Sequence, residues 1–222
     1  MHEWAWVLLW WLIFAGSHLL LSAQPLRGAL IARFSQKGFM GLYSIISLVT
    51  FVLLVMAYWP HRHAGPLLWN LRSIPGIMPL ATLLSALAWM IIVAANMQPS
   101  PVGLAPGASR SARGLTRITR HPLFMGLGLW GLAHCLLNGY ASDVIFFGGF
   151  AVFAIIGGAH QDQRQRLNPP LQAFYDETSL LPFGAILAGR NRLVAAELPW
   201  KGFAVGLIVA ALLYGAHFWL RH

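Results

Sequence analysis

Long apolar stretches recur along the chain, and short segments that contain Gly, Pro and Arg separate most of them. A stretch of about 18 apolar residues or more has the length that an α-helix needs to cross the hydrocarbon layer of a membrane. The pattern predicts six such helices, over residues 4–22, 39–59, 74–97, 122–138, 141–158 and 202–220. We therefore expect an all-α, polytopic integral membrane protein with a single transmembrane domain over residues 1–222.

Composition supports this class of protein and excludes others. Of the 222 residues, 58% are hydrophobic and 9% are charged, which is too few charged residues for the surface of a soluble domain. The formal net charge is +9, but the basic residues lie between the apolar stretches, so no hydrophilic domain is available to bind nucleic acid. The single cysteine, Cys135, excludes an intrachain disulfide and any cysteine cluster for zinc or iron–sulfur.

The distribution of the basic residues predicts the orientation of the chain in the membrane. Twelve of the fifteen Lys and Arg residues lie in the first, third and fifth loops between the expected helices. Because cytoplasmic loops carry the excess of basic residues, both termini are expected on the non-cytoplasmic side. The long fifth loop, at about 159–201, interleaves aromatic, aliphatic and polar residues, so we expect a cytoplasmic-side amphipathic segment there.

Glycines gather on the fourth and fifth expected helices. Small residues let helix backbones approach closely inside a membrane. We therefore expect close helix packing at these positions, namely Gly126, Gly128, Gly131, Gly148, Gly149, Gly157 and Gly158.

Histidine is the only plausible reactive side chain at membrane depth, because all six carboxylates fall at the ends of expected helices or in loops. In the predicted topology, His18 lies near the cytoplasmic end of the first helix and His121 at the cytoplasmic start of the fourth. His134 follows thirteen residues later, about 20 Å towards the other face, where His217 of the last helix is also expected. The histidines therefore form two tiers.

Two imidazoles from different helices at one depth can bind a haem iron from opposite sides. This predicts His18 and His121 as axial ligands, with Arg120, Arg117 and Arg27 at the same interface to bind the propionates. The outer pair, His134 and His217, would permit a second haem. A lone helical histidine can equally well hydrogen-bond a neighbouring helix, and spacing alone leaves both roles open.

Several segments of the chain resemble the NnrU family, which is related to the plant 15-cis-ζ-carotene isomerases. The resemblance covers nearly the whole chain in motif order, and it is carried by "FAGSHLLLS", "KGFMGLYSIISLVTFVLLV", "RHPLFMGLGLWGLAHCLLNG", "DVIFFGGFAVFAIIGG" and "TSLLPFGAILAGR". It implies a multi-pass protein of the bacterial inner membrane. One branch of the family is associated with denitrification and nitric oxide reduction, and the isomerase branch uses haem b to isomerise a polyene.

The resemblance carries over to particular positions. His18 and His121 match the histidines that are understood to be haem ligands in the isomerase, and His134 matches a further family histidine of undefined role. If the chain is an enzyme, the resemblance implies a haem-dependent cis–trans isomerase of a lipophilic small molecule.

Two other functions remain open at the level of sequence. "TRHPLFMG" also resembles the S-adenosylmethionine-binding segment of membrane methyltransferases of the isoprenylcysteine carboxyl type. The adjacent acidic pair of those enzymes is absent here, since Asp162 stands alone between glutamines. The other alternative is a non-catalytic accessory subunit of a membrane reductase, which would suit a small chain without a hydrophilic domain.

Overall fold

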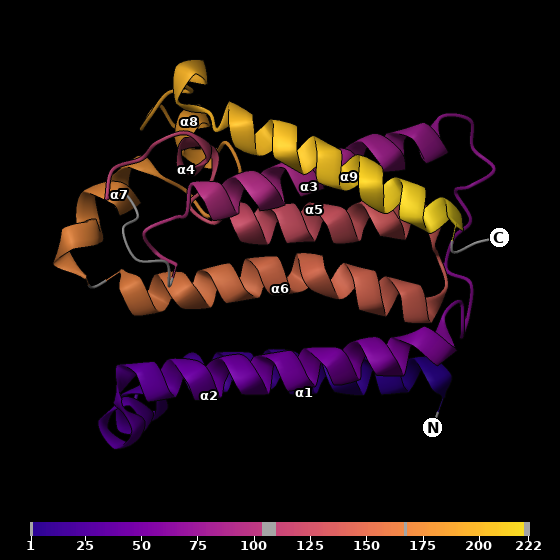
Figure 1. The fold of residues 1–222 in the computed structure, drawn as a ribbon, viewed down its shortest axis with the longest axis horizontal. Helices are drawn as coiled ribbons and strands as arrows, with labels where there is room; N and C mark the ends of the chain where they lie inside the picture. Colours follow the sequence, from indigo (N-terminus) through magenta and orange to yellow (C-terminus); the bar gives the residue numbers. More distant parts are fainter. Residues whose placement is uncertain (1, 104–109, 167, 220–222) are drawn as a thin grey trace. The chain divides into compact units, whose positions relative to one another are not determined.

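The computed structural model describes residues 2–103, 110–166 and 168–219, and its regular elements in these ranges are helices joined by turns and loops (Figure 1). An isolated β-bridge pairs Leu67 with Tyr140. Contacts between residues divide the chain into two compact units, one of residues 1–73 with 135–149 and one of residues 74–134 with 150–222. The long helices are α1 (Glu3–Ser22), α2 (Leu26–Tyr58), α3 (Ile77–Met97), α5 (Pro122–Leu137), α6 (Ala141–Gln165) and α9 (Trp200–Trp219). The short elements are η1 (Trp59–His61), α4 (Leu115–Ile118), η2 (Pro169–Leu171), α7 (Gln172–Glu177), α8 (Gly184–Leu187) and η3 (Ala195–Glu197).

The predicted all-α class is confirmed, and each expected span contains a helix. Among the described residues, five helices are long and apolar enough to cross a membrane, namely α1, α2 with η1, α3, α6 and α9. Helix α5 is also apolar but has 16 residues, which is shorter than the usual span. The long apolar helices are compatible with a membrane protein, whereas six crossings and the orientation of the termini stay predictions.

Two helices extend beyond the expected ranges. Helix α2 begins at Leu26 rather than near residue 39, and its backbone breaks at Ser35, where φ is 64° and ψ is 167°. The Ser35 hydroxyl accepts a hydrogen bond from the backbone N–H of Gly38 at 3.3 Å, as an N-cap does, so a second helical segment starts there. Helix α6 continues past Gly158 to Gln165 because Gln and Arg are good helix formers even where the sequence turns polar.

The first unit is built on the packing of α1 against α2 (Figure 1). Aromatic side chains of this pair contact the start of α6. The Trp11 indole donates a hydrogen bond to the carbonyl of Phe146 at 3.1 Å. Tyr58 stacks on Phe146 with ring centroids 4.0 Å apart. A Cβ added at Gly149 would overlap the Trp11 ring, so the close approach predicted for this glycine is confirmed.

The second unit is built on α3, which packs against α9 (Figure 1). A Cβ at Gly202 would lie 2.8 Å from the Cα of Ala94, so only glycine permits this approach. Helix α5 approaches α6 in the same way, since a Cβ at Gly128 would lie 3.3 Å from that of Ala154. The chain after α6 folds back, and it buries Phe174 in a cluster with Val102.

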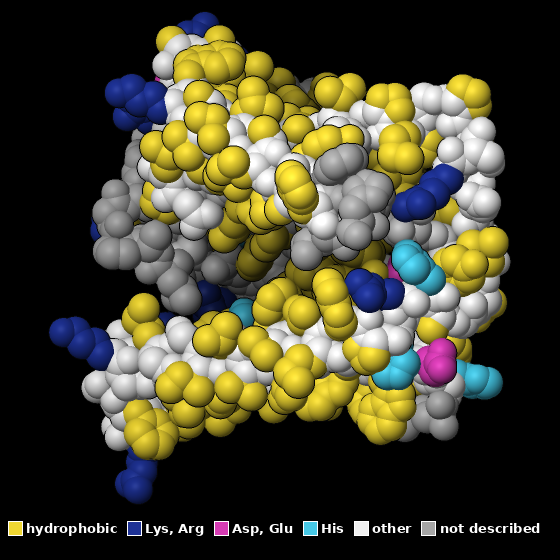
Figure 2. Space-filling view, turned by 45° about the vertical axis from the view of Figure 1, so that its right-hand side comes forward, with side chains coloured by type: hydrophobic (Ala, Val, Ile, Leu, Met, Phe, Trp, Pro, Cys, Tyr) yellow, Lys and Arg dark blue, Asp and Glu magenta, His cyan; other side chains and the backbone are white. Residues whose placement is uncertain are grey.

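Large apolar side chains remain exposed on the flanks of the helices. Leu83 of α3 is 68% exposed and Leu212 of α9 is 69% exposed, and many Leu, Ile and Val residues of α1 and α2 are similar. In the lower part of Figure 2, Lys and Arg side chains lie at the left end and hydrophobic side chains cover the flank. Apolar surface on this scale suits contact with lipid tails rather than with water.

Candidate functional site

The TRH segment of residues 119–121 is held by the chain that follows α7. The backbone N–H of Arg120 donates to the carbonyl of Ser179 at 2.9 Å, and the Thr119 hydroxyl donates to the carbonyl of Leu180 at 2.6 Å. The N–H of Phe183 donates to the carbonyl of Ile118 at 2.7 Å. These bonds join two segments about sixty residues apart in sequence and fix the start of α5.

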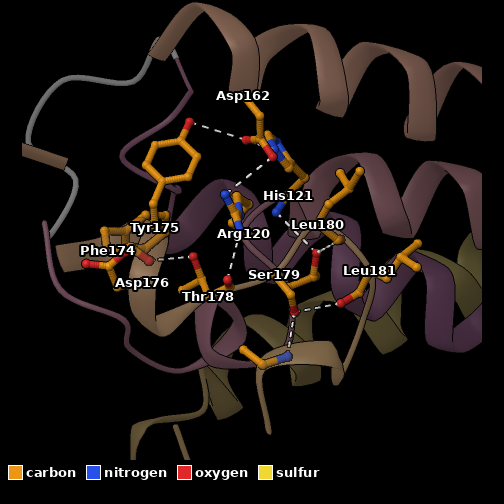
Figure 3. A network of polar contacts seen from close by, with 12 residues as sticks. Arg120, His121, Asp162, Phe174, Tyr175, Asp176, Thr178, Ser179, Leu180 and Leu181 are labelled. Carbon is orange, nitrogen blue, oxygen red and sulfur yellow. Dashed lines mark hydrogen bonds and ion pairs between the residues drawn. The ribbon is translucent and has the colours of Figure 1, made fainter. Parts of the chain in front are cut away.

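Asp162 of α6 is the centre of a polar network at this place (Figure 3). His121 Nε2 donates to its Oδ1 at 2.8 Å, and the Tyr175 hydroxyl donates to the same oxygen at 3.3 Å. Nη1 of Arg120 lies 3.4 Å from Oδ2. The network therefore joins α6, α7 and the start of α5 through one carboxylate.

The histidine of this network is enclosed. Its side chain is 2% exposed and stacks against Phe124, with ring centroids 5.8 Å apart. A Cβ at Gly158 would lie 3.4 Å from the His121 ring, so glycine at this position of α6 makes room for the imidazole. In this conformation, the His121 ring has no open side for a bulky ligand.

Arg120 lies between two kinds of partner. Its guanidinium stands over the Tyr175 ring at 4.5 Å from the centroid, and its Nη2 donates to the carbonyl of Thr178 at 2.8 Å. Burial lowers the pKa of Arg120, and the charge of Asp162 opposes that shift. The pKa of the Tyr175 hydroxyl is raised, first by burial and then by the Asp162 charge, so the phenol stays protonated and can donate.

A cavity of about 410 Å³ opens beside this network. Its charged lining consists of Arg120, Asp162, Arg166, Asp176 and Arg190. Gln172 and Tyr175 complete the lining.

Arg117 lies outside the cavity lining and forms a separate clamp. Its Nε and Nη2 donate to the two carboxylate oxygens of Glu197 at 2.7 and 3.0 Å. The Glu197 carboxylate also accepts from the N–H of Gly114 at 3.2 Å. The hydrogen bond from Arg117 is the main cause that lowers the pKa of Glu197 to about 2, and the carboxylate in turn raises the pKa of Arg117.

The first unit contains a predicted ligand and a predicted propionate partner. His18 is half-buried, with Nδ1 hydrogen-bonded to the Ser47 hydroxyl at 3.0 Å and its ring 4.8 Å from that of Tyr43. Arg27 stands over the ring of Phe39 at 5.3 Å. Both belong to the α1–α2 pair.

The outer-tier histidines belong to the second unit. His134 donates from Nδ1 to the carbonyl of Trp130 at 2.8 Å, and its ring lies 4.5 Å from that of Trp130. His217 is exposed in the last turn of α9.

Comparison with known proteins identifies the family. The model of the NnrU family, described as "NnrU protein", matches residues 6–222. This chain belongs to the NnrU family. The resemblance read from the sequence motifs is thereby confirmed.

Two curated relatives of this NnrU protein carry the same name. The 15-cis-zeta-carotene isomerase, chloroplastic, of Arabidopsis thaliana is 28% identical over 189 residues, which is 82% of this chain and 51% of the plant protein. That of Zea mays is 28% identical over 191 residues, which is 84% of this chain and 52% of the plant protein. The chain thus spans about half the length of these relatives. No solved structure matches it significantly.

The structure of the NnrU chain brings some predicted residues together and leaves others apart. It places Arg120 and His121 in one network, whereas Arg117 pairs with Glu197 instead. His18 and Arg27 belong to the first unit and the other candidates to the second, so haem ligation by His18 with His121 stays a prediction. Within the described ranges, groups of three or more His, Cys, Asp or Glu side chains suited to a metal ion are absent.

Sequence reasoning missed the partners of these residues. In the sequence, Asp162 stands out only as an isolated acidic residue, but its carboxylate binds His121. The sequence feature that could have indicated this contact is the position of Asp162 near the end of α6, the helix that follows α5. A second missed network lies in the first unit, where the fully buried Asp143 accepts from the Tyr58 hydroxyl at 2.8 Å and from Nδ1 of His63 at 2.7 Å.

Proposed function

We propose that this NnrU-family protein is a membrane isomerase that acts on a cis double bond of a long lipophilic polyene. The observation that carries the proposal is the match of more than four-fifths of the chain to two proteins named 15-cis-zeta-carotene isomerase. The plant proteins are about twice as long as this chain, and their name gives 15-cis-ζ-carotene as the substrate on which the proposal is tested.

The helical architecture supports a lipophilic substrate. The exposed flanks of α1, α2, α3 and α9 are rich in Leu, Ile and Val, so a polyene dissolved in the bilayer can reach the protein without crossing water. The proposed location is the bacterial inner membrane, with both termini on the non-cytoplasmic side, on the basis of the basic loops.

Haem b is the proposed cofactor, and His18 has features of a residue that would hold its iron. A ligating imidazole usually has its other ring nitrogen hydrogen-bonded, and Nδ1 of His18 bonds the Ser47 hydroxyl. The ring is also only half-buried. A bound haem would supply an iron centre able to share electron density with a double bond and so lower its barrier to rotation. His18 would hold that iron through its imidazole, and the Ser47 hydroxyl would orient the ring through Nδ1.

The second predicted ligand, His121, fits less well in the described conformation. Its side chain is almost fully enclosed, and its Nε2 is bonded to Asp162. His134 has the same features as His18, because its Nδ1 is hydrogen-bonded and its ring is partly exposed. Variants of His121 and His134 therefore decide between them.

The proposed propionate partners differ in their availability. The Nε and Nη2 donors of Arg117 form a bidentate pair with Glu197, and these two donors would reach a propionate only if that pair broke. The Arg120 side chain already contacts Asp162, Thr178 and Tyr175. The Arg27 guanidinium has one described contact, with the ring of Phe39, and is the best candidate of the three.

The test is conversion of a defined substrate in cells. Bacteria that accumulate 15-cis-ζ-carotene would produce the chain or its His18→Ala variant, and chromatography would follow the isomer ratio. We expect conversion by the unaltered chain and at least a tenfold loss in His18→Ala. Production of equal amounts of both proteins without any conversion would contradict the proposal.

A reduced-minus-oxidised absorption spectrum tests the cofactor separately. A six-coordinate b-type spectrum is expected from the purified chain, and it should change in His18→Ala and in one of the variants His121→Ala and His134→Ala. A chain with no Soret band after production with added haem would contradict haem binding.

A second candidate is a role in nitric oxide reduction or denitrification as an accessory subunit of a membrane reductase. The match to the NnrU family model supports this candidate through the branch of that family that is associated with denitrification. Co-purification with a larger reductase, without turnover by the isolated chain, would support this role. The methyltransferase alternative is weakened, because the Asp162 carboxylate already binds His121, Arg120 and Tyr175 rather than standing open to a cofactor amine.

A further inference from the structure

The cavity beside Asp162 has an excess of positive charge that the proposed isomerisation does not use. Arg120, Arg166 and Arg190 line it, against the carboxylates of Asp162 and Asp176. Asp162 is already engaged by His121 and Tyr175 as well as by Arg120. The negative charge in the lining is therefore only partly available to balance the three guanidinium groups.

Arg120 is incompletely satisfied by the protein. Its Nη2 donates to the carbonyl of Thr178, but its Nε is buried without a hydrogen-bond partner. The 3.4 Å distance from Nη1 to Asp162 exceeds the usual length of about 2.7–2.9 Å for a charge-assisted hydrogen bond. A buried donor without a protein partner is able to bind an oxygen atom of an ion or a ligand.

The other two arginines reach the cavity from separate elements. Arg166 directly follows α6, and its side chain is exposed. Arg190 follows α8, and one of its Nη groups donates to the carbonyls of Asp176 and Thr178 at 2.8 and 3.1 Å, which fixes the guanidinium at the rim. Three arginine forks from three segments converge on one space, as in sites that bind a phosphate through paired hydrogen bonds.

We propose that this cavity binds a phosphate group. A volume of about 410 Å³ is within the usual range for small-molecule sites and leaves room for more than a bare ion. The exposed amide of Gln172 adds a neutral donor. The cavity lies next to the start of α5 and the end of α6. The orientation predicted from the basic loops puts these helix ends at the cytoplasmic face, where lipid headgroups lie.

Two sources can supply this phosphate, a phospholipid headgroup and the free ion. For the free ion, thermal unfolding of the purified full chain would be followed in detergent with rising inorganic phosphate at constant ionic strength. For the headgroup, the chain would be placed in phosphatidylcholine nanodiscs with and without phosphatidic acid, and retained lipid would be counted by native mass spectrometry. Haem content would be measured in every sample, so that failure of the cofactor proposal is seen separately.

The variants are Arg166→Gln and, as a control of equal charge change, Arg192→Gln. Arg192 lies in the same loop region as Arg190 but outside the cavity lining. We expect saturable stabilisation by phosphate, or retention of one phosphatidic acid, with the apparent dissociation constant raised about tenfold in Arg166→Gln and unchanged in Arg192→Gln.

Each outcome decides the proposal. Stabilisation by inorganic phosphate would show that the free ion binds to the cavity. Retention of phosphatidic acid with no stabilisation by inorganic phosphate would show that the ligand is a lipid headgroup. No binding in either experiment, or an equal loss in both variants, would overturn the proposal. If Arg166→Gln fails to fold, Gln172→Glu places a repelling charge in the same cavity and should weaken binding to a similar extent.

Discussion

At the residue scale, the candidate chemistry depends on pairs that are far apart in sequence. His121 and Asp162 are 41 positions apart, and Arg117 and Glu197 are 80 apart. The sequence was enough to select His121 as a candidate, because it is a histidine whose predicted depth in the membrane matches that of His18. The sequence could not show that a carboxylate occupies Nε2 of His121, because that contact depends on how α5 and α6 pack.

The substitution Asp162→Asn tests how much this polar network contributes to the free energy of unfolding. The substitution keeps the shape of the side chain but removes the charge that binds Arg120 and His121, both of which are mostly buried. We expect a loss of about 1–2 kcal/mol in the free energy of unfolding, measured by denaturation of the purified chain. The control is Asp176→Asn, an exposed aspartate of the same cavity, which should change the stability by less than about 0.5 kcal/mol. Equal effects of the two substitutions would contradict the central place of Asp162.

The clamp between Arg117 and Glu197 predicts a dependence of stability on pH. The folded-state pKa of Glu197 is about 2, below the value of about 4.3 for an unfolded glutamate. A depressed pKa contributes stability that is present above the unfolded value and is lost as the pH falls towards the folded value. Glu197→Gln should therefore flatten the fall in melting temperature between about pH 4.5 and pH 2. A variant that loses stability in parallel with the unaltered chain across this window would show that the clamp has no effect.

At the element scale, periodicity located every long helix but not every boundary. The hydrophobic pattern gave the start of α1, α5 and α6 within a residue or two, because these helices begin where apolar runs begin. It missed the first part of α2, where residues 26–34 are helical although the sequence is only moderately apolar. The sequence predicted an amphipathic segment in the fifth loop but not its short helices, because α7 is stabilised by burial of Phe174 and Tyr175 against the rest of the chain.

The glycines of α6 provide a matched pair of substitutions. A Cβ at Gly149 would overlap Trp11, whereas a Cβ at Gly148 would lie 3.8 Å from the Cys135 sulfur in ordinary contact. Gly149→Ala should therefore destabilise the chain by about 1–3 kcal/mol, as overpacking does. Gly148→Ala should be neutral or slightly stabilising, because alanine favours the helix by about 1 kcal/mol. Thermal unfolding in detergent would measure both, and a milder effect at Gly149 than at Gly148 would contradict the packing of α1 against α6.

At the scale of the whole molecule, the charge distribution predicts which loops face the cytoplasm. In a Cys135→Ala background, Arg62→Cys would place a thiol in a loop expected outside, and Arg192→Cys would place one in a loop expected inside. A maleimide reagent that cannot cross the membrane should label only the first in intact spheroplasts and both after lysis. Labelling of Arg192→Cys alone in intact spheroplasts would show that the chain has the opposite orientation in the membrane.

The membrane class and the family were predictable from sequence, because hydrophobic length and ordered motifs are local signals. The residues that would hold a haem could be predicted from the sequence only in part. Depth along the membrane normal follows from sequence position, but the side of a helix on which a ring lies depends on packing. His18 and His134 each have a hydrogen-bonded Nδ1, which sequence spacing alone could not reveal.

The most direct test of the proposed function is the isomer ratio of 15-cis-ζ-carotene incubated with the purified chain in liposomes. The rate would be compared under reducing and oxidising conditions, with His18→Ala beside the unaltered chain. The proposal predicts conversion to the trans isomer that depends on the redox state and falls at least about tenfold in His18→Ala. An unchanged isomer ratio with the haem-loaded, folded chain under both conditions would contradict it.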